Sequence, residues 1–98
     1  MGKYQLTHLA VQDLSDIWNY TFDHWSEHQA DTYHQQLVTA FESIASNPDH
    51  GRNYDGIRSD LFGFKINRHI IFYRIISNEL VEIIRILHQR MDLKNRLT

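Results

Sequence analysis

The segment Leu61–His88, LFGFKINRHIIFYRIISNELVEIIRILH, decides the fold, because its apolar residues recur with the two-residue period of β-strands. The strands that we predict in it are Leu61–Asn67, His69–Ile76 and Leu80–His88. Asn67-Arg68 can turn between the first two strands, and Ser77-Asn78-Glu79 is short enough for a tight hairpin between the last two. The segment therefore predicts a three-stranded antiparallel meander.

The residues before this segment follow a different period, with the three- and four-residue spacing of amphipathic helices. Thr7 has the side chain of an N-cap. The stripe that follows it consists of Ala10, Val11, Leu14, Ile17, Trp18, Thr21, Phe22 and Trp25. Ser26-Glu27-His28-Gln29 fits a capping box, so a second helix begins there and ends near Asn47-Pro48. Because the connection is very short, the two helices are predicted to form an antiparallel hairpin.

Three further segments complete the order of elements. Lys3–Leu6 is predicted to be a short strand, Pro48–Gly56 a loop, and Met91–Leu97 a short terminal helix or a frayed tail. The order β-α-α-β-β-β predicts an α+β fold of two layers, with the helix hairpin packed on a mainly antiparallel sheet. We expect residues 1–98 to form a single domain.

Composition narrows the classes of function. The chain contains no cysteine, which excludes disulfides, thiolate metal sites and a cysteine nucleophile. No stretch approaches the roughly 20 apolar residues of a membrane span. The first residues also lack the apolar core of a signal peptide. We therefore expect a cytoplasmic protein without membrane contact.

Charge is distributed unevenly along the chain. The net charge of −2 argues against a protein that holds nucleic acid by its phosphates, so we expect no direct nucleic-acid binding. Lys3 is the only Lys or Arg among residues 1–50. Residues 51–98 contain the others, which are Arg52, Arg58, Lys65, Arg68, Arg74, Arg85, Arg90, Lys94 and Arg96. This distribution could give the folded protein one basic face. A function in nucleic-acid chemistry therefore stays open as the alternative.

The seven histidines raise the question of a metal site. His24, His28 and Asp31 stand at i, i+4 and i+7, a spacing that would put three ligands on one helix face. The capping box that begins at Ser26 lies between the two histidines and places them on different helices. We therefore predict no metal site and no cofactor.

Residues suited to metal-free cleavage of a phosphodiester occur in the second half. Such cleavage needs a base, an acid and cations beside the phosphate. The candidates are Arg68, Arg74, Arg85, His88 and Arg90. The alternative is that Arg85 pairs with Glu82 or another carboxylate at a sheet edge and that His88 hydrogen-bonds locally.

Strand alternation bears on this choice. In a regular strand, one face carries Glu82, Ile84, Ile86 and His88 and the other carries Val81, Ile83, Arg85 and Leu87. Arg85 and His88 would then point in opposite directions. A single catalytic patch that contains both would need a β-bulge or a strand end at His88.

The first helix has a wider apolar stripe than a two-layer domain must cover. Trp18, Phe22 and Trp25 extend it, and core burial is one explanation of each. The alternative is that part of the stripe stays exposed as a docking groove for a partner helix.

Six short segments, taken in order, resemble the ParE branch of the RelE/ParE toxin superfamily. They are Asp13–Tyr20, Gln29–Tyr33, Asn47–Gly51, Asp55–Arg58, His69–Arg74 and Ile84–Asp92. The resemblance covers nearly the whole chain, and the Ile-Leu-His-x-x-Met-Asp ending at Ile86–Asp92 is its most specific part. It implies the same β-α-α-β-β-β fold that the periodicity predicts.

The resemblance also implies a function. ParE toxins with an assigned target inhibit DNA gyrase, convert it into a source of DNA breaks and are neutralised by a ParD-like antitoxin. The expected protein is thus a non-enzymatic toxin of a type II toxin–antitoxin system that forms a hetero-oligomer with its antitoxin. RelE-type relatives instead cut messenger RNA on the ribosome with basic residues and a Tyr or His near the C-terminus. That activity is the alternative, although this chain has no tyrosine after His88.

Carried over to this chain, the family pattern assigns two groups of residues. The region implicated in toxicity falls on His88, Arg90, Met91 and Asp92, to which we add Arg85 as a gyrase contact. The antitoxin is expected on Leu14, Trp18, Phe22 and Trp25, and on a free sheet edge by strand addition. Purely structural roles remain open, since Asp92 can cap a terminal helix and Met91 can fill the edge of the core.

Overall fold

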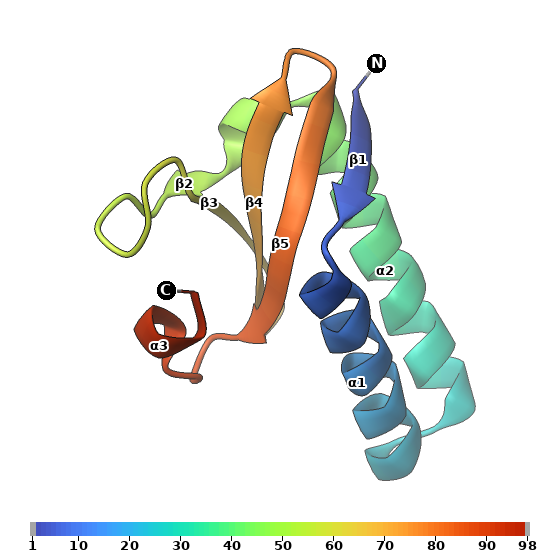
Figure 1. Ribbon diagram of the computed structural model, residues 1–98. Coiled ribbons are helices and arrows are strands. Elements are labelled where there is room, and N and C mark those ends of the chain that lie inside the picture. The colour runs from blue at the N-terminus through green and yellow to red at the C-terminus, as the bar shows by residue number, and fades with distance from the viewer. Residues whose placement is uncertain (1, 98) are drawn as a thin grey trace.

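The computed structural model describes residues 2–97 as one sheet with a helix hairpin and a short C-terminal helix (Figure 1). Its elements are β1 (Lys3–Leu6), α1 (His8–His24), α2 (Glu27–Ser46), the 3₁₀ turn η1 (Pro48–His50), β2 (Arg52–Asn53), β3 (Phe62–Ile66), β4 (His69–Ser77), β5 (Leu80–His88) and α3 (Leu93–Leu97). The predicted α+β class is confirmed. The predicted loop differs in detail, because Pro48–Gly56 contains the turn η1 and the two-residue strand β2.

Both helix starts follow from the predicted caps. The Thr7 hydroxyl accepts a hydrogen bond from the Ala10 N–H at 3.1 Å, and the Ser26 hydroxyl accepts one from the Gln29 N–H at 3.1 Å. Each bond satisfies a backbone donor that the first helical turn leaves without a partner. Because only Trp25 and Ser26 separate α1 from α2, the helices run back along each other as a hairpin.

The strands form one sheet in the order β1-β5-β4-β3-β2. β1 runs parallel to β5, with Lys3 opposite Leu80 and Leu6 opposite Ile83. All other neighbouring strands are antiparallel, so the sheet is mainly antiparallel as predicted. The first strand of the chain therefore pairs with the last one.

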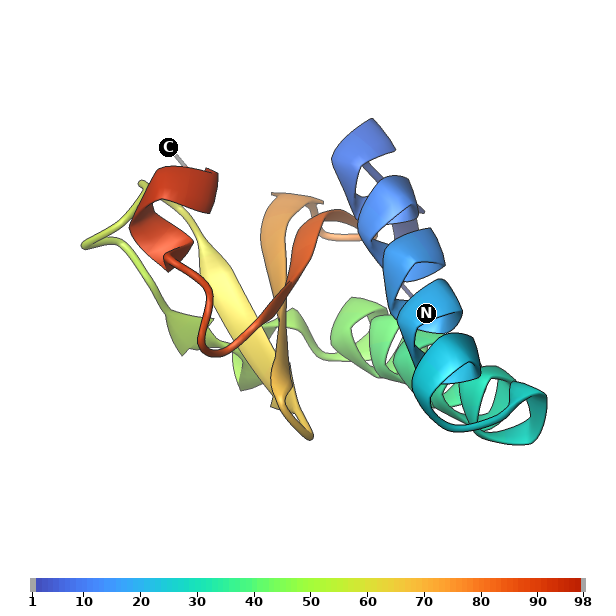
Figure 2. The same ribbon diagram turned by 90° about the horizontal axis from the view of Figure 1, so that it is seen from below.

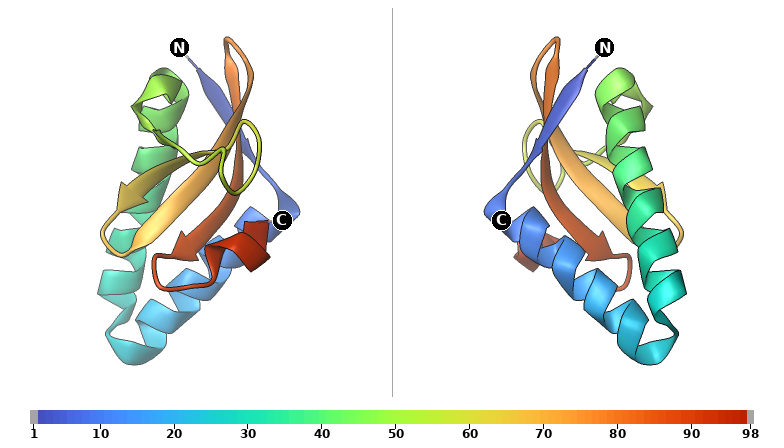
Figure 3. Two further views of the ribbon diagram at one scale, coloured as in Figure 1. Left: turned by 90° about the vertical axis from the view of Figure 1, so that its left-hand side faces the viewer. Right: turned by 90° about the vertical axis from the view of Figure 1, so that its right-hand side faces the viewer.

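The two helices cover one face of the sheet, and Figure 2 shows this arrangement from below. Leu37, Phe41 and Ile44 of α2 are buried in one core cluster with residues of β4 and β5. A second cluster on the opposite face contains Leu61, Ile70, Phe72, Ile84, Leu87 and Leu97. α3 and residues 54–61 pack against this second cluster and cover part of the second face of the sheet (Figure 3).

A β-bulge in β5 corrects the predicted alternation. Phe72 is opposite Arg85 while Tyr73 is opposite Ile83, so Ile84 has no partner on β4. Ile86 and His88 therefore lie on the same face as Ile83, not on the face of Ile84. The pattern could not show this, because both faces of the strand are buried and apolar residues occupy consecutive positions.

Tyr73 ties the loop after α2 to the sheet. Its buried hydroxyl donates to the Pro48 carbonyl oxygen at 2.5 Å and accepts from the Gly51 N–H at 2.9 Å. Burial raises the pKa of this hydroxyl above its ordinary value. A Cβ atom at position 51 would overlap the Tyr73 hydroxyl, so the Asn47–Gly51 segment needs a glycine at its end.

Candidate functional site

One side of α1, continued by its C-cap residue Trp25, carries an apolar strip that is largely exposed. Its members, which we call the outer strip, are Val11, Leu14, Trp18, Phe22 and Trp25. At about 100° per residue they fall within a sector of roughly 80°. Phe22 and Trp25 are exposed to 46% and 71%, whereas Leu14 and Trp18 are half-buried. An apolar strip of this kind is a binding surface for another apolar face.

A groove of about 420 Å³ lies between this strip and α2. Its lining residues are Val11, Leu14, Ser15, Trp18, Asp31 and His34. The Trp18 Nε1–H donates to the Asp31 carboxylate at 3.0 Å, and the indole stacks on Phe22 with ring centroids 5.3 Å apart. The indole is thus held in place before any partner arrives. Of the four residues predicted to bind an antitoxin, the structure brings Leu14, Trp18 and Phe22 together, and Trp25 lies one helical turn beyond Phe22.

The groove lies in an acidic part of the molecule. The chain contains no Lys or Arg from Tyr4 to Gly51. The acidic residues of α1 and α2 are Asp13, Asp16, Asp23, Glu27, Asp31 and Glu42. A segment that fills the groove with apolar side chains gains additional attraction if it also carries Lys or Arg.

The segment from His88 to Asp92 is a tight turn between β5 and α3. The His88 Nδ1 accepts from the Arg90 N–H at 3.1 Å, and the His88 carbonyl oxygen accepts from the Met91 N–H at 2.9 Å. Asp92 caps α3, because its carboxylate accepts from the Asn95 side chain at 2.5 Å and lies 3.5 Å from the Asn95 backbone N. His88 therefore hydrogen-bonds locally and Asp92 caps the terminal helix, which are the structural roles that the sequence left open for them.

Two side chains of this turn remain available to a partner. Arg90 is exposed, and its side chain makes no ion pair within residues 2–97. Met91 is 40% exposed, so it does not fill the core edge as one alternative held. Leu93 and Leu97 pack against the second core cluster instead.

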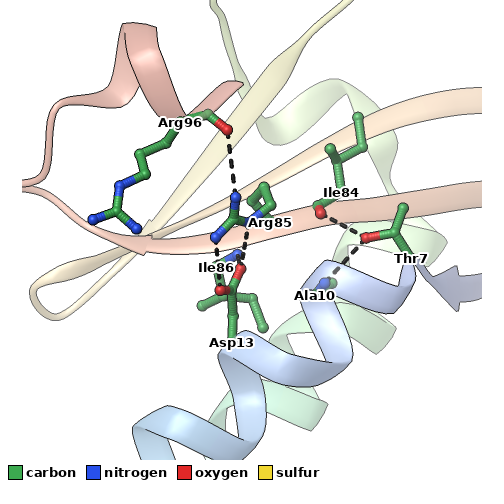
Figure 4. A network of polar contacts seen from close by, with 7 residues as sticks. All are labelled: Thr7, Ala10, Asp13, Ile84, Arg85, Ile86 and Arg96. Atoms are coloured by element: carbon green, nitrogen blue, oxygen red, sulfur yellow. Dashed lines mark hydrogen bonds and ion pairs between the residues drawn. The ribbon is translucent and has the colours of Figure 1, made fainter. Parts of the chain in front are cut away.

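Arg85 has a fixed position at the edge of β5 (Figure 4). Its Nε and Nη2 atoms donate to the two oxygens of Asp13 at 2.7 and 2.9 Å, and Nη1 donates to the Arg96 carbonyl oxygen at 3.4 Å. Hydrogen bonding to Asp13 raises the pKa of Arg85. The partner is therefore a carboxylate of α1, whereas Glu82 pairs with Arg74 at 3.3 Å.

Arg85 and His88 do not form one patch. The bulge at Ile84 leaves Arg85 opposite Phe72 and His88 opposite His69, on different faces of the sheet. The two residues point in opposite directions as predicted, although each has changed its set of neighbours on the strand. A catalytic centre that uses both is incompatible with this arrangement.

His88 instead has two neighbours that the sequence analysis did not identify. The His69 and His88 rings are 5.5 Å apart, and the His69 Nδ1 lies 2.7 Å from the Tyr33 hydroxyl of α2. Burial lowers the pKa of His69, and the nearby His88 lowers it further. Burial also raises the pKa of Tyr33. Counting outward from the pairing of Ser77 with Leu80 would have placed His69 opposite His88.

Within residues 2–97 no three His, Asp or Glu side chains are close enough together to hold a metal ion. The spaced set of His24, His28 and Asp31 is split between α1 and α2, as the capping box indicated. No helix of the described range is sufficiently long and apolar to cross a bilayer.

Comparisons with known proteins agree on one family. A family model described as the ParE toxin of the type II toxin–antitoxin system parDE matches residues 4–93. Toxin ParE1 of Mycobacterium tuberculosis (strain CDC 1551 / Oshkosh) is 36% identical over 96 residues, which is 98% of each chain. Toxin ParE1 of Caulobacter vibrioides is 36% identical over 97 residues, which is 99% of each chain.

A solved structure supports the fold. It is described as the chromosomal ParDE TA system from P. aeruginosa, and its chain superposes with a TM-score of 0.77 at 16% sequence identity. The superposition covers 90% of this chain and 96% of that chain. The shared fold thus extends over nearly the whole of both molecules.

Proposed function

The chain belongs to the ParE toxin family of type II toxin–antitoxin systems, and from this premise we propose that it inhibits DNA gyrase by binding to it. A ParD-like antitoxin neutralises it in a hetero-oligomeric complex. The toxin acts in the cytoplasm, where gyrase acts on DNA, and it acts without catalysis. The observation that carries the binding part of this proposal is the uncovered outer strip beside the groove of α1 and α2.

The antitoxin occupies the groove, with Leu14, Trp18, Phe22 and Trp25 as its contacts. Two features of the groove support this assignment. The Trp18 indole is held by Asp31 and by Phe22, so little side-chain entropy is lost on binding. The surrounding helices carry only acidic charge, so the matching antitoxin segment is an amphipathic helix with apolar residues and Lys or Arg beside them.

Substitutions in the outer strip test the antitoxin site. Trp18→Ala and Phe22→Ala are expected to weaken antitoxin binding by about tenfold or more in isothermal titration calorimetry, as for aromatic residues at the centre of an interface. Tyr20→Ala is the matched control, because Tyr20 is 60% exposed but lies on the opposite side of α1. Equal losses for all three variants would contradict the assignment.

Gyrase contact is made by the turn after β5, through His88, Arg90, Met91 and Asp92, with Arg85 beside it. The support is geometric. His88 and Asp92 fix the turn, and between them Arg90 and Met91 present one cation and one apolar side chain to solvent. Arg85 is held by Asp13 and contributes mainly to the shape of this edge.

A gyrase assay with purified protein tests the target. The protein is expected to inhibit supercoiling by gyrase and to cause cleaved DNA to accumulate. The double variant Arg90→Ala, Met91→Ala is expected to inhibit gyrase with about tenfold lower potency. Lys65→Ala with Ile76→Ala is the matched control, since it also removes one exposed cation and one exposed apolar side chain. Unaffected supercoiling at saturating protein would overturn the proposal.

A second candidate function is ribosome-dependent cleavage of messenger RNA. The observation that favours it is the pair of His69 and His88, because an acid and a base are what such cleavage needs. Cuts linked to codons in a translation extract, lost in both His69→Asn and His88→Asn, would support it. Such cuts together with normal gyrase activity would replace the first proposal by this one.

A further inference from the structure

A second pocket of about 450 Å³ lies on the other side of β5 from α2, between the start of α1, the turn before β3 and α3. Its lining residues are Leu9, Arg58, Ile84, Arg85, Arg96 and Leu97. We call it the arginine pocket. Figure 4 shows Ile84, Arg85 and Arg96, with the Arg96 carbonyl oxygen toward Arg85 and the Arg96 side chain directed away from it. Its volume is in the range of pockets that hold small ligands or single side chains of a partner.

The chemistry of the pocket combines an apolar floor with a cationic rim. Ile84 and Leu97 are 8% and 4% exposed and form the floor, while Leu9 is 54% exposed at the rim. Three of the lining residues are arginines from three separate parts of the chain, which are the turn at Arg58, β5 and α3. Such a site favours a ligand that presents a carboxylate or phosphate next to an apolar group.

The pocket carries an excess of positive charge. Asp13 compensates the charge of Arg85. The side chains of Arg58 and Arg96 make no ion pair within residues 2–97. Two like charges beside an apolar floor repel each other, and a bound anion would relieve this repulsion.

Arg85 is held in one orientation by its hydrogen bonds. A guanidinium group has five N–H donors. Three of them are used, two by Asp13 and one by the Arg96 carbonyl oxygen, which leaves two. Because these bonds fix the group, binding an anion does not require it to be immobilised first.

We propose that the arginine pocket binds an acidic segment of a protein partner. One Asp or Glu carboxylate of the segment accepts hydrogen bonds from Arg58 and the remaining donors of Arg85, while Arg96 adds a positive charge nearby. A neighbouring apolar side chain rests on Ile84 and Leu97. The site lies apart from the groove of α1 and α2, so the proposal does not depend on the identity of the antitoxin, although the pocket shares Arg85 with the edge that we assign to gyrase contact.

A peptide suits the pocket better than a nucleic acid does. Proteins that bind nucleic acid by its phosphates present a stripe of cations, whereas these three arginines line one pocket. A phosphate backbone also offers no apolar side chain that could pack on the apolar floor of the pocket.

Nuclear magnetic resonance titration of the full chain tests this proposal. The probe is the blocked peptide Leu-Glu-Leu-Glu, its matched control is Leu-Gln-Leu-Gln, and a short oligothymidylate is the third titrant. The acidic peptide is expected to shift the backbone signals of Leu9, Ile84 and Leu97 and the Nε–H signal of Arg85. The amide peptide is expected to shift them little at equal concentration.

Two variants connect the shifts to the pocket. Arg58→Gln and Arg96→Gln are each expected to weaken binding of the acidic peptide by about three- to tenfold, because each removes one positive charge at the pocket. Arg68→Gln is the matched control, since Arg68 is exposed outside the pocket. Spectra of the free variants report their folding, and either variant alone suffices if the other unfolds.

Several outcomes would overturn the proposal. Equal binding of the amide peptide would reduce the site to an apolar patch. Stronger binding of the oligothymidylate that both variants weaken would make it a phosphate site. Shifts spread over the surface, or no shifts at all, would leave no site for an acidic segment.

Discussion

At the edge of β5, the Asp13 carboxylate stands where a neighbouring strand would otherwise be. β1 ends opposite Ile83, so the backbone of β5 beyond that residue has no strand on that side. The Thr7 hydroxyl donates to the Ile84 carbonyl oxygen at 2.7 Å, and Asp13 accepts from the Ile86 N–H at 3.0 Å. The two side chains satisfy backbone groups that would otherwise lack partners in the protein.

We predict that Asp13→Ala lowers the free energy of unfolding by about 2–4 kcal/mol, measured by urea denaturation. The substitution leaves the largely buried Arg85 without its counter-charge and the Ile86 N–H without its acceptor. Asp16→Ala is the control, because Asp16 is exposed on the same helix and hydrogen-bonds only to Gln12 among the described residues. A loss no larger than that of the control would show that the ion pair has little effect on stability.

His69 predicts how stability changes with pH. Burial and the nearby His88 lower the pKa of His69 in the folded protein below the ordinary value of 6.5, so the unfolded chain binds the proton first. The free energy of unfolding should therefore fall as the pH drops below about 6.5 and until the lower pKa of the folded state is reached. In urea titrations from pH 7 to pH 5, His69→Asn should flatten this dependence. An unchanged slope in the His69 variant would contradict the prediction.

The sequence predicted single residues well where their partners are local. Thr7 and Ser26 bond three residues ahead, so their roles follow from the chain itself. Asp13 and Arg85 are 72 residues apart, and nothing in the sequence identifies the one carboxylate that reaches that arginine. Long-range pairing depends on where the helix lies on the sheet, which periodicity does not determine.

Among the elements, the helices and long strands were predictable and the irregularities were not. The predicted strand Leu80–His88 has those same bounds in the structure. After the bulge at Ile84, however, each residue lies on the opposite face of the sheet from the one that regular alternation predicts. A polar residue on a solvent-facing side normally reveals such a change. Here α3 and residues 54–61 bury the second face too, so Ile83, Ile84 and Ile86 give no such signal.

The short helix α3 is predicted to contribute to stability as well as to recognition. Leu97 is 4% exposed in the second core cluster, so Leu97→Ala should lower the free energy of unfolding by about 2–3 kcal/mol in urea denaturation. Met91→Ala, at a side chain 40% exposed, should change it by less than about 1 kcal/mol. Similar losses in both variants would contradict the packing described. Deleting the chain from Met91 onward would therefore confound loss of a contact surface with loss of the core.

At the scale of the whole molecule, charge is separated. α1 and α2 carry six acidic residues and no Lys or Arg, whereas nine of the ten Lys and Arg follow position 51. The composition already indicated this asymmetry. In the folded protein, the acidic residues of the first half lie around the groove of α1 and α2. The arginine pocket is lined by basic residues of the second half.

The charge separation predicts that salt slows association with the antitoxin. Raising ionic strength from about 50 mM to about 500 mM should lower the association rate constant by about tenfold in stopped-flow fluorescence of Trp18 and Trp25, since screening weakens steering. Asp31→Asn should reduce this dependence, and Asp60→Asn, outside the helix hairpin, should not. A rate constant that does not change with salt would argue against a basic antitoxin segment.

The pairing of the first strand with the last has a consequence for biosynthesis. A nascent chain emerges from its N-terminus, and Lys3–Leu6 has no partner until Leu80–Ile83 has also emerged. The attachment of α1 to the sheet also forms later, because Thr7 bonds to Ile83 and Ile84. Contacts between such distant residues form late. The sheet therefore closes only after β5 has been synthesised, and prematurely terminated chains that lack β5 cannot assemble it.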